Sequence, residues 1–303
     1  MNCLLTGASG FIGSRLLKKL SRDGFQVSII ARSKIAGYKT YVCDFEKDQI
    51  PEVAFQSVDL VYHLAGAAHD ISGLKKDVSK YRILNIDITE KLAQLASRNN
   101  VKKFIFISSV KAGGLPYSGY CSSELNQNMP EGIYGKTKRE AELKLLEIGK
   151  SLALNVSIIR PSLVYGPNMK GNLGLMLSGI KKGWFPPLPK VSNKRSMIHV
   201  DDLVMSIVYV SKHESSNNEI YIATDGRIYS SDQIYDLMCI ELGNRIPKWR
   251  VPRTLFIFSF FGGVNFRRKI KKLFGDECYS SSKLESIGFS AKKTFEDFNE
   301  SDF

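Results

Sequence analysis

The sequence predicts an α/β fold in which a doubly wound parallel sheet carries helices on both faces. Short apolar runs alternate with longer amphipathic runs through the first half of the chain, a pattern typical of βαβ units. The length of 303 residues suits one large α/β domain, or a main domain with a smaller lobe. With 43% hydrophobic and 24% charged residues, the composition excludes collagen, a long disordered tail and a multi-span membrane protein.

The first elements follow from their own patterns. Residues 2–6 are expected to form a strand that runs into a glycine-rich loop. Residues 11–20 are expected to form a helix, because Leu16, Leu17 and Leu20 share one face and the basic side chains lie off it. Further strands are expected at residues 25–31, 40–43, 60–64, 104–107 and 156–159, and further helices at residues 79–97 and 136–152.

The glycine-rich loop, from Gly7 to Gly13, has the spacing G-x-x-G-x-x-G and lies between the first strand and the first helix. Glycines in this place permit a tight turn and let a pyrophosphate approach the backbone, while the helix N-terminus offers N–H groups to phosphates. The second strand is followed by Arg32, with no acidic residue nearby. An acid there binds the ribose of NAD, whereas an arginine accommodates the 2′-phosphate of NADP. The sequence therefore predicts a dinucleotide site, with NADP(H) preferred over NAD(H).

The regular alternation loosens after Gly166, where glycines and prolines become frequent. Open α/β sheets bind ligands at the carboxyl ends of their strands, and a small lobe can cover that edge. We therefore expect residues 1–166 to form a dinucleotide-binding domain. Residues 167–303 are expected to form mainly a substrate-binding lobe, interleaved with elements that return to the sheet.

The chain is basic, with 43 Lys and Arg against 30 Asp and Glu and a net charge of +13. Such a balance favours anionic partners. The densest basic block, residues 267–272, lacks interleaved aromatic residues and a recognition motif, so nucleic-acid binding is not expected. The most apolar segment, residues 255–264, is about half as long as a spanning helix requires, so at most peripheral membrane contact is expected.

Cysteine and histidine usage predicts neither a disulfide framework nor a metal site. The five cysteines are scattered and form no C-x-x-C pair, which favours a reducing, cytoplasmic compartment. No secretory signal opens the chain. The four histidines form no H-x-x-x-H grouping, so no metal ion is expected.

A serine, a tyrosine and a lysine are predicted at the same edge of the sheet as the glycine-rich loop. Tyr134 and Lys138 are four residues apart, so their side chains share one face of a helix. The Lys138 ammonium is expected to lower the pKa of Tyr134, which could then exchange protons with a substrate oxygen. Ser109 follows a buried strand, and its hydroxyl can bind the same oxygen.

Together these residues resemble the extended short-chain dehydrogenases/reductases, and within them the NAD-dependent epimerase/dehydratase family that acts on nucleotide sugars. The matching residues occur in family order over roughly residues 1–210. They are Thr6 to Gly13, Asp44-Phe45, His63 to Gly66, Ser108-Ser109, Tyr134 to Lys138, Arg160-Pro161, Val164 to Pro167 and residues 195–202.

The resemblance implies a Rossmann-like fold with a small C-terminal substrate-binding lobe, a UDP-sugar substrate and a homodimer packed through the helix at 136–152 and its predecessor. The catalytic set would be Ser109, Tyr134 and Lys138, with Tyr134 as acid/base. The residues expected to hold the cofactor are Gly7, Gly10, Phe11, Ile12, Gly13, Arg32, Asp44, Phe45, Leu64, Ala65, Gly66, Tyr134 and Lys138. Arg195 would bind the sugar nucleotide, with Lys170 and Asn172 as further candidates.

Three departures from the family pattern bear on function. Ser109 is followed by Val110 and Lys111, where the 4,6-dehydratases of the family carry Asp-Glu, so dehydration is not expected. Ile88 replaces the glycine of an N-x-x-G-T segment, so helix packing is expected to differ there. Leu273 stands about where a second diphosphate-binding arginine is expected.

Two enzyme activities and one non-catalytic role remain open. The first is a 4-ketoreductase that reduces a UDP-4-keto-6-deoxy-N-acetylhexosamine in bacterial surface-polysaccharide (O-antigen) biosynthesis. The second is a 4-epimerase of the UDP-glucose or UDP-N-acetylglucosamine type. Arg32 favours the reductase, because NADPH is the usual reducing cofactor. The third is a catalytically silent dinucleotide-binding sensor or scaffold, against which the intact Ser109, Tyr134 and Lys138 set argues.

Overall fold

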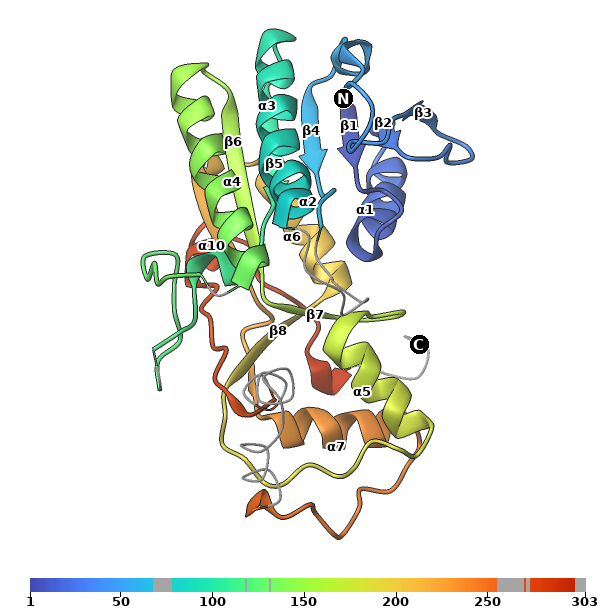
Figure 1. Cartoon of the computed structure of the whole chain (residues 1–303), viewed down its shortest axis with the longest axis vertical. Helices are drawn as coiled ribbons and strands as arrows, with labels where there is room; N and C mark the ends of the chain where they lie inside the picture. The colour runs from blue at the N-terminus through green and yellow to red at the C-terminus, as the bar shows by residue number, and fades with distance from the viewer. Residues whose placement is uncertain (68–77, 118, 131, 255–269, 271–272, 298–303) are drawn as a thin grey trace.

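The computed structural model describes residues 1–67, 78–117, 119–130, 132–254, 270 and 273–297 (Figure 1). Its main sheet has seven parallel strands in the order β3-β2-β1-β4-β5-β6-β9, which confirms the predicted doubly wound α/β fold. The strands are β1 (Asn2–Thr6), β2 (Gln26–Ala31), β3 (Lys39–Val42), β4 (Leu60–His63), β5 (Lys103–Ile107), β6 (Asn155–Pro161) and β9 (Glu219–Ala223).

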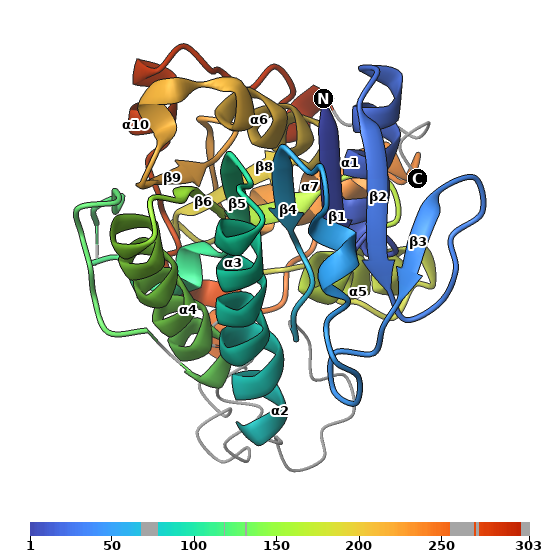
Figure 2. The same cartoon turned by 90° about the horizontal axis from the view of Figure 1, so that it is seen from above.

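Helices cover both faces of this sheet, as Figure 2 shows from above. On one face lie α1 (Phe11–Arg22) and α6 (Val200–Lys212), and on the other lie α3 (Ile88–Arg98) and α4 (Gly132–Ser151). Leu5 faces the first pair and Leu4 the second, because side chains alternate along a strand. Both leucines are fully buried, and each such side chain stabilises the fold by roughly 1.5–3 kcal/mol.

Residues beyond 166 complete the main domain, since β9 is the last strand of its sheet and α6 covers one face of that sheet. The helix expected at residues 79–97 is divided into α2 (Val78–Arg82), a π-helical turn (Ile83–Asp87) and α3. The structure also has single 3₁₀ turns at Glu52–Phe55, Val110–Gly113, Glu214–Ser216 and Phe295–Asp297.

A smaller lobe lies below the carboxyl ends of the strands in Figure 1. Its three-stranded sheet has the order β10-β8-β7, and the helices α5 and α7 pack on it around Met176, Met197 and Tyr235. The elements of this lobe are β7 (Leu163–Tyr165), α5 (Gly171–Lys181), β8 (Arg195–His199), β10 (Ile228–Tyr229) and α7 (Ser231–Glu241). The short helix α10 (Ser282–Ser286) returns to the main sheet, where its Leu284 is buried in the same core as Leu5.

Some sequence expectations fall outside the described residues. These are the apolar segment 255–264, most of the basic block 267–272, and His69. Of the helices that the structure describes, none is long and apolar enough to cross a membrane.

Candidate active site

The glycine-rich loop packs directly on the loop that follows β4. Gly7 has a φ of +76°, which favours glycine, and a Cβ on it would lie 2.7 Å from the Ala65 nitrogen. A Cβ on Gly13 would collide with the Gly7 carbonyl. Gly10 caps α1 without a side-chain hydrogen bond, so the N–H groups of the first turn remain available to a ligand. A loop lined only by backbone at a helix N-terminus fits the pyrophosphate of a dinucleotide.

The first two residues of α1 anchor this helix. Phe11 packs against the core of the smaller lobe, and Ile12 packs against the core between the main sheet and the helices α1 and α6. The Arg15 guanidinium lies over the Phe11 ring, 4.9 Å from its centroid, and donates to the Pro167 carbonyl at 2.6 Å. The glycine-rich loop is therefore held between the sheet and the lobe.

A buried polar chain fixes the loop from Leu64 to Gly66. The Ala65 N–H donates to the Thr6 hydroxyl at 3.2 Å, and that hydroxyl lies 2.7 Å from His63 Nδ1. His63 Nε2 lies 2.9 Å from the Thr89 hydroxyl. Burial, and to a smaller extent the charge of Lys138, lowers the pKa of His63 to about 3, so the ring is neutral and one nitrogen donates while the other accepts.

Asn85, in the π-helical turn, joins this loop to α4. Its Oδ1 accepts from the Ala67 N–H at 2.8 Å, and its Nδ2 donates to the Ala67 carbonyl and to the Thr137 hydroxyl at 3.1 and 3.0 Å. A Cβ on Gly66 would lie 2.7 Å from Asn85 Oδ1, so a larger residue there would displace the Asn85 amide. Asn85 is the first residue of the N-x-x-G-T segment of the family pattern, but that pattern alone does not indicate these hydrogen bonds.

Ser109, Tyr134 and Lys138 come together at the carboxyl ends of β5 and β4. The Ser109 hydroxyl accepts from the Lys111 N–H at 3.3 Å and forms a hydrogen bond with Tyr134, which lies in the first turn of α4. Lys138 is buried, donates from Nζ to the Ile107 carbonyl at 2.9 Å and lies 4.3 Å from the Phe106 ring centroid. Its Nζ is also 3.6 Å from where a Cβ on Gly66 would be, which places the ammonium beside the predicted cofactor loop.

The pKa values of this set differ from the expectation. Burial raises the pKa of Tyr134 to about 12, and the hydrogen bond with Ser109 opposes that rise. The charge of Lys138 is not among the causes that act on Tyr134, so the expected lowering of the tyrosine pKa by lysine is wrong for this structure. The reason is that the Lys138 ammonium is directed to the Ile107 carbonyl. Burial lowers the pKa of Lys138 itself to about 8, and the Glu142 carboxylate opposes that decrease.

A buried ion pair lies one helical turn beyond Lys138. Arg160, at the carboxyl end of β6, donates from Nε and Nη2 to the two Glu142 oxygens at 2.8 and 2.5 Å, and the two side chains are 0% and 1% exposed. A Cβ on Gly113 would lie 3.1 Å from Arg160 Nη1, so the guanidinium also lies against the turn after Ser109. Arg160 belongs to the family motifs of the sequence, but no motif indicates Glu142 as its partner.

Arg32 and Asp44 lie at the same edge, after the neighbouring strands β2 and β3. The Asp44 carboxylate accepts from the Glu46 N–H at 3.1 Å, and Phe45 packs against the core. Arg32 is exposed and forms no hydrogen bond or ion pair with another described residue. Its guanidinium is therefore available to a ligand, but nothing in the fold fixes it there.

The predicted substrate residues belong to the smaller lobe. Lys170 caps α5 and Asn172 lies in its first turn, and both are exposed. Arg195, in β8, is 8% exposed and pairs with Glu277 at 3.3 Å. Its charge is thus partly compensated by a residue from the end of the chain.

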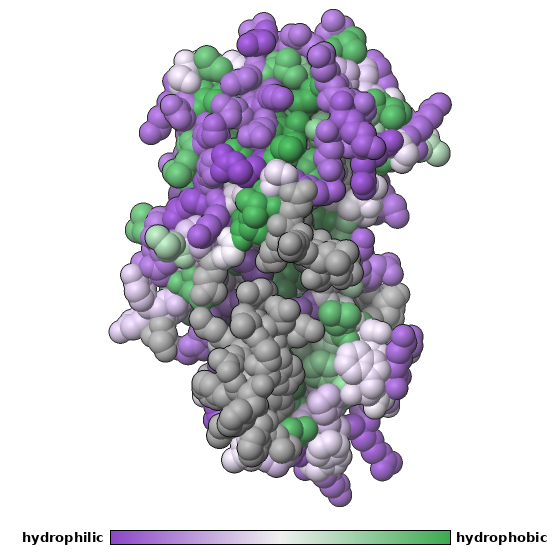
Figure 3. All heavy atoms as spheres, in the orientation of Figure 1, coloured by the Kyte–Doolittle hydropathy of each residue, from purple (hydrophilic) through white to green (hydrophobic). Residues whose placement is uncertain are grey.

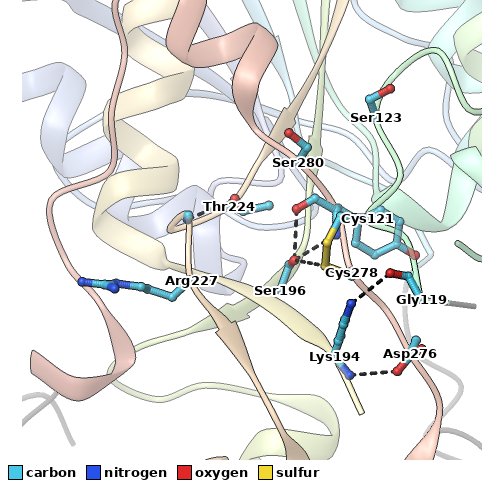
Figure 4. The surroundings of a disulfide bond; sticks show 12 residues. Gly119, Cys121, Ser123, Lys194, Ser196, Thr224, Arg227, Asp276, Cys278 and Ser280 are labelled. Atoms are coloured by element: carbon cyan, nitrogen blue, oxygen red, sulfur yellow. Dashed lines mark hydrogen bonds between the residues drawn. A yellow bond between two sulfur atoms is a disulfide. The ribbon is translucent and has the colours of Figure 1, made fainter. Parts of the chain in front are cut away.

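Cys121 and Cys278 form a disulfide with a Cα–Cα distance of 4.4 Å (Figure 4). A disulfide framework was not expected, and this one bond departs from that expectation because two residues 157 positions apart meet only through tertiary structure. Backbone hydrogen bonds from Ser122 N–H to the Cys278 carbonyl and from Ser280 N–H to the Ser122 carbonyl, each 2.9 Å, bring the two segments together. The cytoplasmic location stays a prediction.

The disulfide joins the loop before α4 to the segment that contains Glu277, the ion-pair partner of Arg195. Around it, the Lys194 ammonium donates to the Gly119 carbonyl at 2.9 Å, and the Lys194 N–H donates to Asp276 at 2.8 Å (Figure 4). The other three cysteines are buried and unpaired. In the described part of the chain, no three His, Cys, Asp or Glu side chains are grouped closely enough to hold a metal ion.

Comparison with known proteins identifies the same family that the motifs predicted. The model of the NAD dependent epimerase/dehydratase family matches residues 3–223. A UDP-glucose 4-epimerase of Vibrio cholerae is 32% identical over 266 residues, which cover 86% of this chain and 80% of that protein. An N-acetyl-α-D-glucosaminyl-diphospho-ditrans,octacis-undecaprenol 4-epimerase of Escherichia coli O157:H7 is 28% identical over 97% of this chain and 91% of its own.

Solved structures share the fold. The UDP-glucuronic acid 4-epimerase of Bacillus cereus, determined with UDP-glucuronic acid and NAD, superposes with a TM-score of 0.80 at 19% identity, over 100% of this chain and 98% of that one. The UDP-glucose 4-epimerase of Thermotoga maritima, determined with UDP-glucose, gives a TM-score of 0.80 at 21% identity, over 100% of this chain and 97% of that one. At these identities the likeness establishes the Rossmann-like architecture alone.

Proposed function

The chain belongs to the NAD-dependent epimerase/dehydratase family, and we propose that it is a UDP-sugar 4-epimerase that uses NAD(H). One observation carries this proposal. Ser109, Tyr134 and Lys138 are assembled beside a backbone-lined dinucleotide loop, in a chain that is 32% identical to a UDP-glucose 4-epimerase. Neither Val110 nor Lys111 can act as the carboxylic acid that dehydration needs, which supports epimerisation over that reaction.

The site residues divide into those that hold the cofactor and those that handle the proton. Gly7 to Gly13 would bind the diphosphate of NAD, and the loop from Leu64 to Gly66 with Lys138 would hold the part near its nicotinamide. When bound, NAD supplies hydride chemistry at C4 of the sugar. The cofactor fits because the glycines let the loop of Gly7 pack directly on the loop of Ala65 at the N-terminus of α1, where backbone N–H groups face a ligand.

Tyr134 is proposed to accept the proton of the sugar 4-hydroxyl at Oη and later to return it. That exchange needs the phenolate, which burial disfavours in the free protein. The hydrogen bond from Ser109 opposes this effect, and a shift of the Lys138 ammonium from the Ile107 carbonyl toward a ligand would oppose it further. An active enzyme therefore needs all three side chains, whereas a silent binding module needs none of them.

Arg32 favours a second candidate, a 4-ketoreductase that consumes NADPH and a UDP-4-keto-6-deoxy-N-acetylhexosamine. The exposed guanidinium after β2 could reach a 2′-phosphate. The epimerase is preferred because the comparisons support an NAD-dependent family and give no support for NADP. A third substrate class is a sugar linked to a polyprenyl diphosphate, since the alignment with the E. coli relative extends over 97% of the chain, against 86% for the V. cholerae relative.

The proposal is tested by incubating the purified protein with UDP-glucose, UDP-N-acetylglucosamine or a polyprenyl-diphosphate N-acetylglucosamine and following the C4 configuration by NMR. We expect the 4-epimer to form without net oxidation or reduction. The Tyr134→Phe variant should retain NAD and lose at least two orders of magnitude of turnover. Tyr120→Phe, which alters an exposed tyrosine of the preceding loop, is the matched control and should be fully active. NADPH consumption with a 4-keto sugar, and no epimer, would favour the reductase.

We also propose a homodimer formed through α3 and α4. Leu143 of α4 is 59% exposed and Leu152, the residue after its C-terminus, is 46% exposed, so two leucines are open to solvent along this helix and at its end. Sedimentation velocity should show a dimer for the unmodified chain and a monomer for Leu143→Glu. A monomer at all protein concentrations would refute the proposal.

A further inference from the structure

Two loops at the far end of the smaller lobe have an unusual composition. They comprise residues 181–190, which begin at the last residue of α5, and residues 243–254, and together they are called the basic loop pair. They contain seven lysines and arginines and no aspartate or glutamate. The basic residues are Lys181, Lys182, Lys190, Arg245, Lys248, Arg250 and Arg253. A one-signed charge of this density marks a surface for an anionic partner.

The two loops lie side by side at the lower end of the molecule in Figure 1. The Val251 N–H donates to the Pro187 carbonyl at 3.1 Å, and Arg250 Nη1 donates to the Leu188 carbonyl at 3.4 Å. Leu188 is buried in the core that α5 and α7 share. The basic loop pair is therefore held together on a packed base, and the lower end of the molecule in Figure 3 has hydrophilic spheres beside pale and apolar ones.

Most of the charge on this surface is uncompensated. Lys190 and Arg250 are paired with the acids of α7, at 3.4 Å to Asp232 and 2.8 Å to Asp236. The other five cations are exposed and form no ion pair with any residue that the structure describes. They are Lys181, Lys182, Arg245, Lys248 and Arg253. These side chains serve no visible purpose within the fold.

Both tryptophans of the chain lie on the same surface. Trp184 and Trp249 are 59% and 62% exposed, and Ile246 is 41% exposed. The residue after Trp184 behaves differently, because the Phe185 ring packs inward on Tyr235 with centroids 6.1 Å apart. Phe185 thus supplies the aromatic side chain of this core, while both indoles stay largely exposed, that of Trp184 resting on the Phe185 ring at a centroid distance of 5.9 Å. Indole rings, with an apolar body and one N–H donor, are suited to the boundary between water and lipid.

We propose that the basic loop pair docks the protein on the surface of an anionic phospholipid bilayer. The cations would face the lipid phosphates and the two indoles would enter the headgroup region, so charge and amphipathic aromatic area act on one surface. Each cation near such a surface is expected to change the binding constant by about fivefold. This inference goes beyond the proposed function, since a water-soluble UDP-sugar can be epimerised whether or not the protein is on a membrane.

The test uses the full chain and vesicles of phosphatidylcholine with or without phosphatidylglycerol. We expect co-sedimentation only with phosphatidylglycerol, weakened by salt. Because Trp184 and Trp249 are the only tryptophans, intrinsic fluorescence reports on this surface alone. Binding should shift the emission to shorter wavelength and protect it from acrylamide. Co-sedimentation without a change in emission would overturn the proposal, as would failure to bind, or an emission change with single-stranded DNA but not with vesicles.

A charge variant and its control separate docking from other functions. Lys181→Gln with Lys182→Gln and Lys248→Gln should weaken vesicle binding by roughly 100-fold. The control is the triple variant Lys18→Gln, Lys91→Gln and Lys150→Gln, which removes the same charge from exposed positions on the main domain. It should bind as the unmodified chain does, and equal losses in the two variants would overturn the proposal. Epimerase assays with UDP-sugar should give the same turnover for both, so loss of docking and loss of catalysis are read independently.

Discussion

Replacing Glu142 by glutamine should destabilise the fold strongly. Arg160 and Glu142 are fully buried and joined by two charge-assisted hydrogen bonds of 2.8 and 2.5 Å. Removing one partner of a buried pair leaves an uncompensated charge, which costs about 3–5 kcal/mol. Among the described residues, Arg160 Nη1 has no hydrogen-bond partner, and beside Glu142 the guanidinium reaches only the neutral Gln127 Oε1, at 3.3 Å from Nη2, which cannot neutralise its charge. We therefore expect Glu142→Gln to lower the free energy of unfolding by about 3–5 kcal/mol.

The assay is urea denaturation at constant pH, with Glu140→Gln as the matched control. Glu140 lies on the same helix and pairs with Arg82, but the two side chains are 40% and 52% exposed. An exposed pair contributes only about 0–1 kcal/mol, so the control should be nearly as stable as the unmodified chain. If Glu142→Gln costs no more than Glu140→Gln, the buried pair does not have the stated energetic role.

A double variant distinguishes loss of the pair from loss of packing. Glu142→Leu combined with Arg160→Met replaces the two charges by apolar side chains of similar volume. Such replacements of buried ion pairs are commonly neutral or stabilising, so the double variant should recover most of the stability that either single change removes. Destabilisation of the double variant by the full sum of the single effects would refute the reasoning.

Further predictions concern the cofactor loop, the pH dependence and the disulfide. Gly7→Ala should weaken NAD binding at least tenfold by calorimetry, whereas Gly24→Ala, at a φ of +79° with nothing within 4 Å, should cost only about 1 kcal/mol of stability and leave binding unchanged. Because the pKa of Lys138 is about 8 and its ammonium form is the active one, kcat/KM should decline as pH rises above about 8, and pH-rate profiles with a flat upper limb would contradict this. Cys121→Ser should lower the free energy of unfolding by up to about 5 kcal/mol, since the cross-link to Cys278 spans 157 residues. A thiol reductant should then bring the unmodified chain to the value of the variant, and unequal values would be evidence against the cross-link.

The sequence predicts the structure correctly where a local residue pattern determines it. Strand β1 and helix α1 flank glycines whose spacing reflects backbone contacts, so the loop between them was predictable. The family motifs also located Tyr134 and Lys138 on one helix, although the direction of the Lys138 ammonium depends on the Ile107 carbonyl of another strand.

Features formed by distant segments were not predictable from local patterns. The disulfide joins positions 157 apart, and no spacing rule connects them. The Glu142 partner of Arg160 lies on a helix face where a sequence pattern would place an exposed acid. The π-helical turn at Asn85 depends on hydrogen bonds to Ala67 and Thr137, which periodicity does not encode. In each case tertiary contacts determine the local structure.

The most direct test of the central claim is to run the reaction of a UDP-sugar in D₂O and to measure deuterium at C4 of the product by NMR. If Tyr134 exchanges the hydroxyl proton while the hydride is returned by the same bound NAD, the 4-epimer should form with no deuterium at C4. Deuterium at C4 would contradict the account. So would the failure of every diphosphate-linked sugar tested to give a 4-epimer.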